Sequence, residues 1–169
     1  MAHPNVVFMG VCGCGKSTVA RRYAAATGYA VVEADDFHPP ANVAKMQSGQ
    51  PLTDEDRAGW LDALAARLAE GRARGETMVL TCSALKRAYR DRLRQADPDL
   101  FFVHLAGTRE LLARRLGERQ GHFMPASLLD SQLAALEAPQ APAERCLTVD
   151  IASPPEVLCA TVATFLRGA

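Results

Sequence analysis

The sequence predicts an α/β fold in which helices flank a parallel sheet. Short apolar runs of the kind that form buried parallel strands recur along the 169-residue chain, and each is followed by a segment with helical character. This alternation is typical of a doubly wound sheet. The runs span residues 5–10, 29–34, 77–82, 100–106 and 146–151. No linker or internal repeat interrupts them, so we expect one domain over residues 1–169.

Two helices have clear start signals in the sequence. Thr53 can cap a helix that carries apolar residues at helical spacing over residues 60–68, and Asp56 can reach back to the cap. Near the end of the chain, Ser153 is placed to cap a second helix, with Pro154 in its first turn. Both helices should pack one apolar face against the sheet.

The composition narrows the classes of partner. Lys plus Arg equals Asp plus Glu at 19 each, so the charge balance does not favour nucleic acid. No apolar stretch approaches the roughly 20 residues that cross a bilayer, and no targeting signal precedes the first strand, so we expect a cytoplasmic protein without a membrane partner. The five cysteines show neither disulfide nor zinc spacing, which predicts reduced thiols.

The first predicted strand runs into a complete phosphate-binding loop of the form GxxxxGK[ST]. The loop reads Gly10-Val11-Cys12-Gly13-Cys14-Gly15-Lys16-Ser17, and Thr18 continues into the next helix. Glycines let backbone N–H groups turn toward phosphates, and the start of the helix adds partial positive charge. Lys16 supplies a full charge for the phosphates, and Ser17 is placed to ligate Mg²⁺. A bound nucleotide is therefore expected.

The second strand should deliver a carboxylate to the same edge of the sheet. Asp35 directly follows this strand, where it could hold Mg²⁺, orient an acceptor hydroxyl or take its proton. Asp35 and Asp36 could instead be solvated loop residues. Asp150 also follows apolar residues and could be a Walker-B carboxylate that binds Mg²⁺, but its place beside the Ser153 helix favours a structural role. The guanine-selecting pattern Asn-Lys-x-Asp does not occur.

Further short segments carry a more specific signal. They are Asp35 with His38-Pro39; Asn42, Lys45-Met46, Gly49, Pro51-Leu52, Asp54, Asp56-Arg57 and Trp60-Leu61; Cys82-Ser83-Ala84-Leu85-Lys86 with Tyr89-Arg90-Asp91 and Leu93-Arg94; and Gly121-His122-Phe123-Met124, Ser131-Gln132 and Leu136-Glu137. With the phosphate loop, this series resembles the bacterial gluconate kinase (gluconokinase) family over nearly the whole chain. The sequence departs from it at Cys12, where Ser is usual, and at Ala34, where Gly is usual.

The resemblance implies the fold of nucleoside monophosphate and shikimate kinases, with a five-stranded parallel sheet and a mobile lid. It also implies ATP, Mg²⁺, D-gluconate as the acidic sugar substrate and 6-phosphogluconate as product, and often a homodimer. The acceptor-binding region then covers about residues 35–60 and the lid about residues 119–137.

An acidic sugar needs a cation for its carboxylate and several polar groups for its hydroxyls. The residues available for this on the acceptor side are Asp35, His38, Lys45, Arg57, Ser83, Lys86 and Arg90. The carboxylate partner is Arg57, Lys86 or Arg90, a choice that the sequence leaves open. The family segments add His122 and Gln132. Arg87, Arg92 and Arg94 fit a solvated helix face better.

An arginine-bearing helix precedes the glycine-containing segment 120–123 and marks the expected lid. Closure would exclude water and bring an arginine onto the transferring phosphoryl group. Arg119 is the first choice for this catalytic role. Arg115 is the second choice, and it could instead contact adenine. Arg109 and Arg114 fit ordinary helix-surface positions.

Two other functions share the phosphate loop. A related small-molecule kinase, such as shikimate kinase, would also use Lys16, Asp35 and the lid but would differ in acceptor chemistry. A nucleotide-dependent switch would hydrolyse ATP slowly without any small acceptor. Release of ADP that depends on an acceptor would distinguish an enzyme from a switch.

Overall fold

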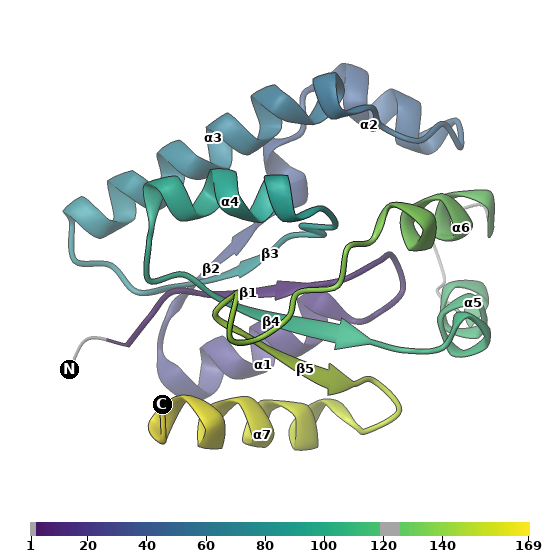
Figure 1. Cartoon of the computed structure of the whole chain (residues 1–169). Helices are drawn as coiled ribbons and strands as arrows, with labels where there is room; N and C mark the ends of the chain where they lie inside the picture. Colours follow the sequence, from purple (N-terminus) through teal and green to yellow (C-terminus); the bar gives the residue numbers. More distant parts are fainter. Residues whose placement is uncertain (1–2, 119–125) are drawn as a thin grey trace.

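The computed structural model describes residues 3–118 and 126–169, and a five-stranded parallel sheet forms its centre (Figure 1). The strand order is β2-β3-β1-β4-β5, and all neighbouring pairs are parallel. The strands are β1 (Val6–Met9), β2 (Ala30–Glu33), β3 (Met78–Thr81), β4 (Phe101–Ala106) and β5 (Cys146–Asp150). These match the five apolar runs to within one residue at each end, which confirms the predicted fold class.

Helices cover both faces of the sheet (Figure 1). They are α1 (Lys16–Thr27), a 3₁₀ turn η1 (Ala34–Phe37), α2 (Pro40–Gln47), α3 (Asp54–Ala73), α4 (Arg87–Ala96), α5 (Arg109–Glu118), α6 (Ala126–Ala135) and α7 (Pro155–Arg167). The helices α3 and α4 lie on one face, and α1 and α7 lie on the other. The segment that joins α5 to α6 lies outside the described residues, so the expected lid motion stays a prediction.

The central strand β1 separates two hydrophobic cores. Val6 and Phe8 pack with residues of α1 and α7, whereas Val7 and Met9 pack with residues of α3 and α4. All four side chains are fully buried, and successive residues of a strand point to opposite faces. A strand buried on both faces therefore reads as a continuous apolar run, which is why β1 was visible in the sequence.

One of the two predicted helix caps is present and the other is wrong. At the start of α3, Asp56 N donates to Thr53 Oγ1 at 3.1 Å, and Thr53 N donates to Asp56 Oδ2 at 2.9 Å. At the start of α7 the cap position is Pro154, and no side chain caps it. Ser153 lies one residue too early, in a turn where its N–H donates to Asp150 O at 3.1 Å. Pro154 lies at the cap instead of the first turn.

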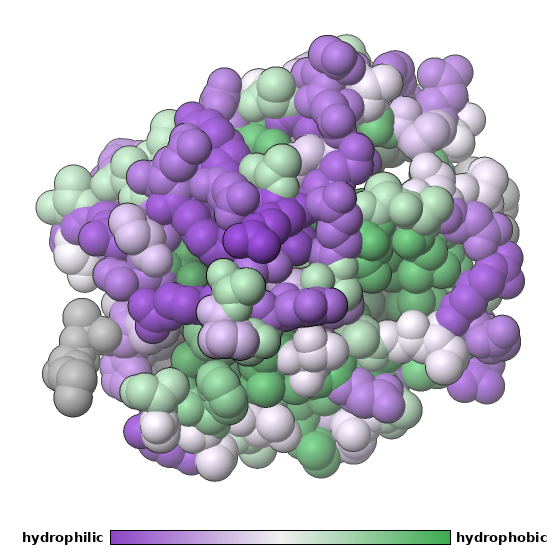
Figure 2. Space-filling view, viewed as in Figure 1, coloured by the Kyte–Doolittle hydropathy of each residue, from purple (hydrophilic) through white to green (hydrophobic). Residues whose placement is uncertain are grey.

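The hydropathy of the surface varies across the face of the molecule shown in Figure 2. Figure 2 shows mainly hydrophilic residues over α3 and α4, whereas hydrophobic residues gather below them and toward the side of α5 and α6. Among the residues placed in the structure, none of the helices combines the length and the apolarity needed to span a bilayer.

Candidate active site

A cavity of about 700 Å³ opens at the carboxyl ends of the parallel strands. Its walls come from the loop after β1, from η1, from the connection between α2 and α3, from the end of β3, and from α5, α6 and the start of α7. This edge is where ligands bind in open α/β sheets. The phosphate loop and Asp35 therefore share one cavity, as the sequence predicted.

The phosphate loop needs its glycines for steric reasons. Gly10 has a φ of +148°, and a Cβ atom there would lie 2.8 Å from Cys14 Sγ and 2.9 Å from Leu105 O. Gly13 and Gly15 also have positive φ values, of +83° and +91°. These conformations turn the backbone into an open cradle at the start of α1, where N–H groups can face an anion. The loop thus fits a nucleotide's phosphates.

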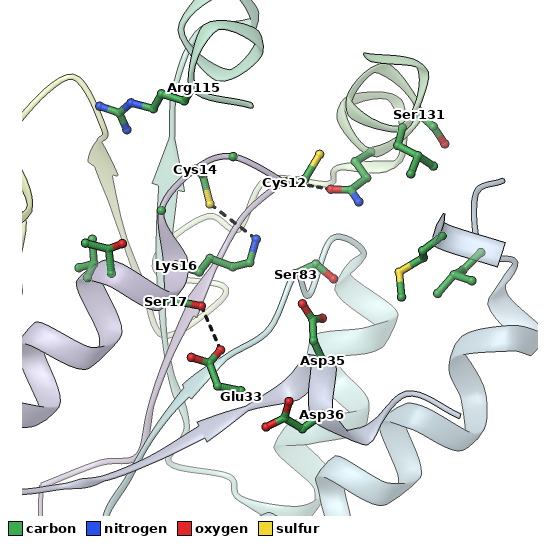
Figure 3. Close-up of a pocket in the computed structure, with 18 of the residues that line it drawn as sticks. Cys12, Cys14, Lys16, Ser17, Glu33, Asp35, Asp36, Ser83, Arg115 and Ser131 are labelled. Atoms are coloured by element: carbon green, nitrogen blue, oxygen red, sulfur yellow. Dashed lines mark hydrogen bonds between the residues drawn. The ribbon is translucent and has the colours of Figure 1, made fainter. Parts of the chain in front are cut away.

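The ammonium of Lys16 lies inside this cradle (Figure 3). Its Nζ donates to Gly10 O at 3.0 Å and to Val11 O at 3.1 Å, and it lies 3.8 Å from Cys14 Sγ. Two carbonyl oxygens thus hold the charge within the loop. The ammonium can exchange them for the β- and γ-phosphate oxygens of a nucleotide.

Glu33 is a site residue that the sequence reasoning missed. Ser17 Oγ donates to Glu33 Oε2 at 3.0 Å, and Thr81 Oγ1 donates to the same oxygen. The other oxygen, Oε1, lies 3.2 Å from Arg21 Nη2. The sequence did hold a signal for this residue. Glu33 is a carboxylate at the end of an otherwise apolar strand, two residues before Asp35.

The side-chain oxygens of Ser17, Glu33 and Asp35, which we call the oxygen cluster, suit Mg²⁺. The ion takes oxygen ligands, keeps several waters and usually binds one or two carboxylates together with nucleotide phosphates. The Ser17 hydroxyl and the carboxylates of Glu33 and Asp35 line the same cavity beside the phosphate loop. The residues present therefore fit the Mg²⁺ that accompanies ATP in P-loop kinases.

Asp35 presents its carboxylate to the cavity from η1. Its side chain is 87% exposed and points toward Ser83 in the view of Figure 3. Trp60 Nε1 donates to Ala34 O at 2.7 Å and fixes the backbone next to Asp35. Asp36 lines the cavity as well, so the structure leaves both carboxylates as candidates.

His38 packs against Trp60 next to this turn and is not one of the residues that line the cavity. Its ring stacks on Trp60 with centroids 4.3 Å apart, and its Nε2 lies 3.9 Å from Asp35 Oδ1. Burial lowers the pKa of His38; Asp35 opposes this shift, and the charge of Arg57 adds to it. The ring is therefore mainly neutral near pH 7. Its stacking on Trp60, away from the residues that line the cavity, does not match the predicted direct contact with substrate.

Of the cations proposed for the substrate carboxylate, Arg57 is the one that lines the cavity within the described part of the chain. Its Nη1 donates to Leu52 O at 2.8 Å and to Tyr89 Oη at 3.2 Å, and its guanidinium lies 5.4 Å from the centre of the Tyr89 ring. These contacts hold the arginine at the acceptor side.

The other three cations expected at the acceptor side are not among the residues that line the cavity. Lys45 Nζ pairs with Asp56 at 2.6 Å, and Lys86 Nζ pairs with Asp54 at 3.1 Å. Arg90 is buried in an ion pair with Glu144, so the expectation that it binds substrate does not match its location. Each of these cations forms an ion pair with a carboxylate from another segment of the chain. Sequence spacing does not reveal such pairs.

Further polar side chains complete the acceptor side. Ser83 lines the cavity as predicted, and its carbonyl accepts from Gly10 N at 3.3 Å. Gln132 also lines it, but its Oε1 accepts from Cys12 N at 2.7 Å, so it contacts the phosphate loop. Gln50 and Ser131 are additional lining residues. Ser131 belonged to a family segment, whereas nothing in the sequence marked Gln50.

Residues of α5 and of the start of α7 form another part of the cavity wall. Arg115 lines it and donates from Nη2 to Ile151 O at 2.6 Å, next to lining residues Ser153, Pro155 and Leu158. This location favours the adenine contact among the two roles expected for Arg115. Arg119 and His122 lie outside the described residues.

Cys82 is a structural thiol, and the other cysteines are buried as well. Cys14, Cys82, Cys146 and Cys159 are buried, and burial raises the pKa of Cys82 to about 12. A thiol with so high a pKa is a poor nucleophile at neutral pH. Cys12 is also largely buried at the cavity wall.

A phosphate loop and a facing carboxylate, joined by one cavity on a five-stranded parallel sheet, define a P-loop kinase. The family model of the AAA domain matches residues 6–139. A gluconokinase from Gluconobacter oxydans is 55% identical over 134 residues, which cover 79% of this chain and 75% of that protein. The chain therefore belongs to the gluconokinase family.

Solved structures agree with this assignment. A sugar kinase from Janibacter sp. HTCC2649 superposes with a TM-score of 0.93 at 49% identity, covering 98% of this chain and 95% of that one. A gluconokinase from Sinorhizobium meliloti 1021 gives a TM-score of 0.89 at 46% identity, covering 98% and 93%.

Proposed function

We propose that this chain transfers the γ-phosphoryl group of ATP to the terminal hydroxyl of D-gluconate, which gives 6-phospho-D-gluconate and ADP. The relatives support the substrate, since they include gluconokinases from several organisms. The single observation that carries the proposal is that Lys16, Asp35 and Arg57 line one cavity. A phosphate site, a carboxylate for the reacting hydroxyl and a cation for the acid group are thus available together.

The phosphate loop and the oxygen cluster would bind the nucleotide. Backbone N–H groups of the loop and Lys16 face the phosphates, and Lys16 neutralises the charge that develops during transfer. Mg²⁺ bound with ATP would supply positive charge against the phosphates. Ser17 and Asp35 would hold it, and Glu33 would orient the Ser17 hydroxyl through the 3.0 Å hydrogen bond.

The acceptor would bind in an extended conformation between Arg57 and Asp35. Arg57 pairs with the carboxylate at one end of the six-carbon chain, so that the hydroxyl at the other end reaches Asp35. Asp35 orients this hydroxyl and accepts its proton as the hydroxyl oxygen bonds to the γ-phosphorus, while the bond from that phosphorus to the bridging oxygen breaks and ADP leaves. Ser83, Gln132, Gln50 and Ser131 provide donors and acceptors for the hydroxyls in between.

The remaining predictions concern the lid, the assembly and the location. We propose that residues 119–137 close over the site and bring Arg119 onto the transferring phosphoryl group, while Arg115 contacts adenine. We also propose one domain over residues 1–169, a cytoplasmic location, no nucleic-acid partner and, by family resemblance, a homodimer.

A coupled ADP-release assay tests the proposed function. The purified chain is given MgATP with gluconate, shikimate, glucose, ribose or a nucleoside monophosphate in turn, and 6-phosphogluconate is identified by mass and by its dehydrogenase-coupled signal. We expect gluconate to give by far the highest kcat/KM. Comparable use of glucose or shikimate, or ADP release that does not depend on any acceptor, would contradict the proposal.

A further inference from the structure

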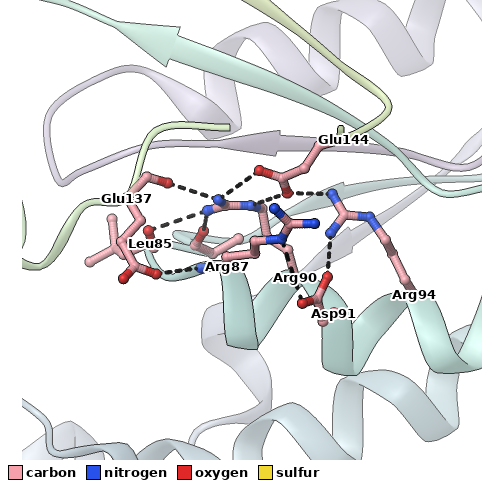
Figure 4. Close-up of polar contacts among 8 residues, drawn as sticks. Leu85, Arg87, Arg90, Asp91, Arg94, Glu137 and Glu144 are labelled. Carbon is pink, nitrogen blue, oxygen red and sulfur yellow. Dashed lines mark hydrogen bonds and ion pairs between the residues drawn. The ribbon is translucent and has the colours of Figure 1, made fainter. Parts of the chain in front are cut away.

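The guanidinium of Arg90 is buried, and fixed partners occupy its donors (Figure 4). The residue is 1% exposed. Nε and Nη2 donate to the two carboxylate oxygens of Glu144 at 2.8 and 3.0 Å, and Nη2 also donates to Glu137 O at 2.8 Å. Nη1 donates to Ala84 O at 2.8 Å and to Leu85 O at 3.2 Å. A guanidinium has five N–H donors, so none is left for a substrate.

Glu144 keeps this arginine in place. It lies in the segment before β5 and also accepts from Arg94 Nη2 at 2.6 Å. Burial raises the pKa of Glu144, but hydrogen bonds from Arg90 and Arg94 outweigh this effect and lower it to about 2. The carboxylate is therefore ionised at neutral pH. We call the ion pair of Arg90 and Glu144, with its bonds to the carbonyls of residues 84 and 85, the Arg90 clamp.

The clamp holds a backbone conformation that the sequence alone would disfavour. Ala84 has a φ of +45° and is fully buried, and it is the one residue other than glycine with positive φ in the described part of the chain. A Cβ atom makes this left-handed region unfavourable for alanine. The carbonyls of Ala84 and Leu85 both accept from Arg90 Nη1, so the strained residue is fixed on its carboxyl side.

This conformation sets the position of Ser83. Rotation about φ of Ala84 moves the preceding peptide group, which contains the Ser83 carbonyl. That carbonyl accepts from Gly10 N at 3.3 Å, at the first glycine of the phosphate loop. The Ser83 side chain lines the cavity near Asp35. If Ala84 relaxed to negative φ, Ser83 would lose its bond to the loop and move within the acceptor side.

We propose that Arg90, held by Glu144, is a positioning residue that fixes Ser83 through the strained Ala84 and so sets the affinity for the acceptor. The proposal rests on the proposed function, because it assigns Ser83 to the acceptor side. Arg90 acts without touching substrate, which accounts for the location of an arginine so close to the site yet outside the cavity.

The experiment measures acceptor and nucleotide constants separately in the full chain. In Glu144→Gln, we expect KM for gluconate to rise and kcat/KM to fall by about tenfold, which corresponds to about 1.4 kcal/mol. The dissociation constant of a non-hydrolysable ATP analogue should stay within about twofold. A loss of folded protein alone would lower the apparent kcat and leave KM unchanged, so the rise in KM separates positioning from stability.

A second substitution, Ala84→Gly, tests whether strain at residue 84 links Arg90 to Ser83. Ala84→Gly removes the conformational strain, because glycine adopts positive φ freely. In the Glu144→Gln background it should restore most of the affinity for gluconate, and in the wild type it should change KM by no more than about twofold. Arg94→Gln is the matched control, since Arg94 binds Glu144 without touching the carbonyls of residues 84 and 85. Its KM for gluconate should stay near the wild-type value.

The outcomes separate this inference from the proposed function. If the wild type is active and Glu144→Gln keeps its KM for gluconate, or if Ala84→Gly fails to restore it, the positioning role is refuted. If Glu144→Gln does not fold, Glu144→Asp keeps the charge but shortens the side chain, and the same criteria apply. If the wild type itself does not phosphorylate gluconate, the proposed function fails instead.

Discussion

Replacement of Arg57 by Gln tests the acceptor site most directly. In the described part of the chain, Arg57 donates its hydrogen bonds from Nη1. Its Nε and Nη2 therefore stay available for a carboxylate. Two parallel N–H···O bonds between these atoms and an acid group form a bidentate, charge-assisted contact. Gluconate has such a group and glucose does not. The substitution should therefore affect gluconate much more than glucose.

The expected size follows from the type of contact. Hydrogen bonds to charged groups contribute about 1.5–3 kcal/mol, which corresponds to a factor of about 10 to 150 in kcat/KM. We expect most of the loss in KM for gluconate, because the carboxylate lies far from the reacting hydroxyl. Arg57→Lys keeps the charge but loses the bidentate geometry, so it should fall between the wild type and Arg57→Gln.

Steady-state ADP release with gluconate and with glucose gives both constants for each variant. Lys86→Gln is the matched control, because Lys86 was an equal candidate in the sequence but pairs with Asp54 at the surface. Exposed pairs of this kind contribute about 0–1 kcal/mol, so its selectivity should change little. Thermal unfolding checks that the loss of the bonds to Leu52 and Tyr89 leaves Arg57→Gln folded. Unchanged selectivity in Arg57→Gln, or a larger effect in Lys86→Gln, would refute the reasoning.

Three further predictions follow from the site and the clamp. Lys16→Met should lower kcat/KM by several orders of magnitude in the same assay, since it removes the charge that faces the transferring phosphoryl group; near-normal turnover would contradict this role. Asp35→Asn should lower kcat by about 10²–10⁴-fold with ATP-analogue binding retained, and Asp36→Asn should not; the reverse pattern would move the catalytic role to Asp36. Burial raises the pKa of Glu144, but its arginine partners lower it to about 2, below the unfolded value near 4.5, so its stabilising effect is present above about pH 4.5 and is lost as the pH falls toward 2. Thermal melts between pH 7 and pH 3 should therefore show a smaller acid-induced drop in Tm for Glu144→Gln than for the wild type, and parallel curves would argue against this linkage.

Features that depend on short stretches of chain were predictable from the sequence. The five buried strands follow from apolar runs, because a strand covered on both faces needs apolar residues at every position. The phosphate loop and the capping box at Thr53 and Asp56 each lie within eight residues, so their spacing alone defines their geometry. Asp35 was predictable because the ends of parallel strands meet at one edge.

Only the tertiary structure decided which charged residues face the cavity. Glu33 meets Ser17 and Thr81 because β3 lies between β2 and β1, an order that no single segment encodes. Arg94, expected on a solvated helix face, instead packs over Phe102 and pairs with Glu144.

Arg57, Lys86 and Arg90 were equivalent cations in the sequence, and their fates differ because their partners are distant in the chain. Lys86 meets Asp54, 32 residues away, and Arg90 meets Glu144, 54 residues away. Arg57 keeps one edge of its guanidinium for the cavity. A buried charge must be paired, and the residue that pairs with it is set by how helices and loops pack after folding. The sequence therefore determined the chemistry available to this protein, and tertiary packing determined which side chains can reach the substrate.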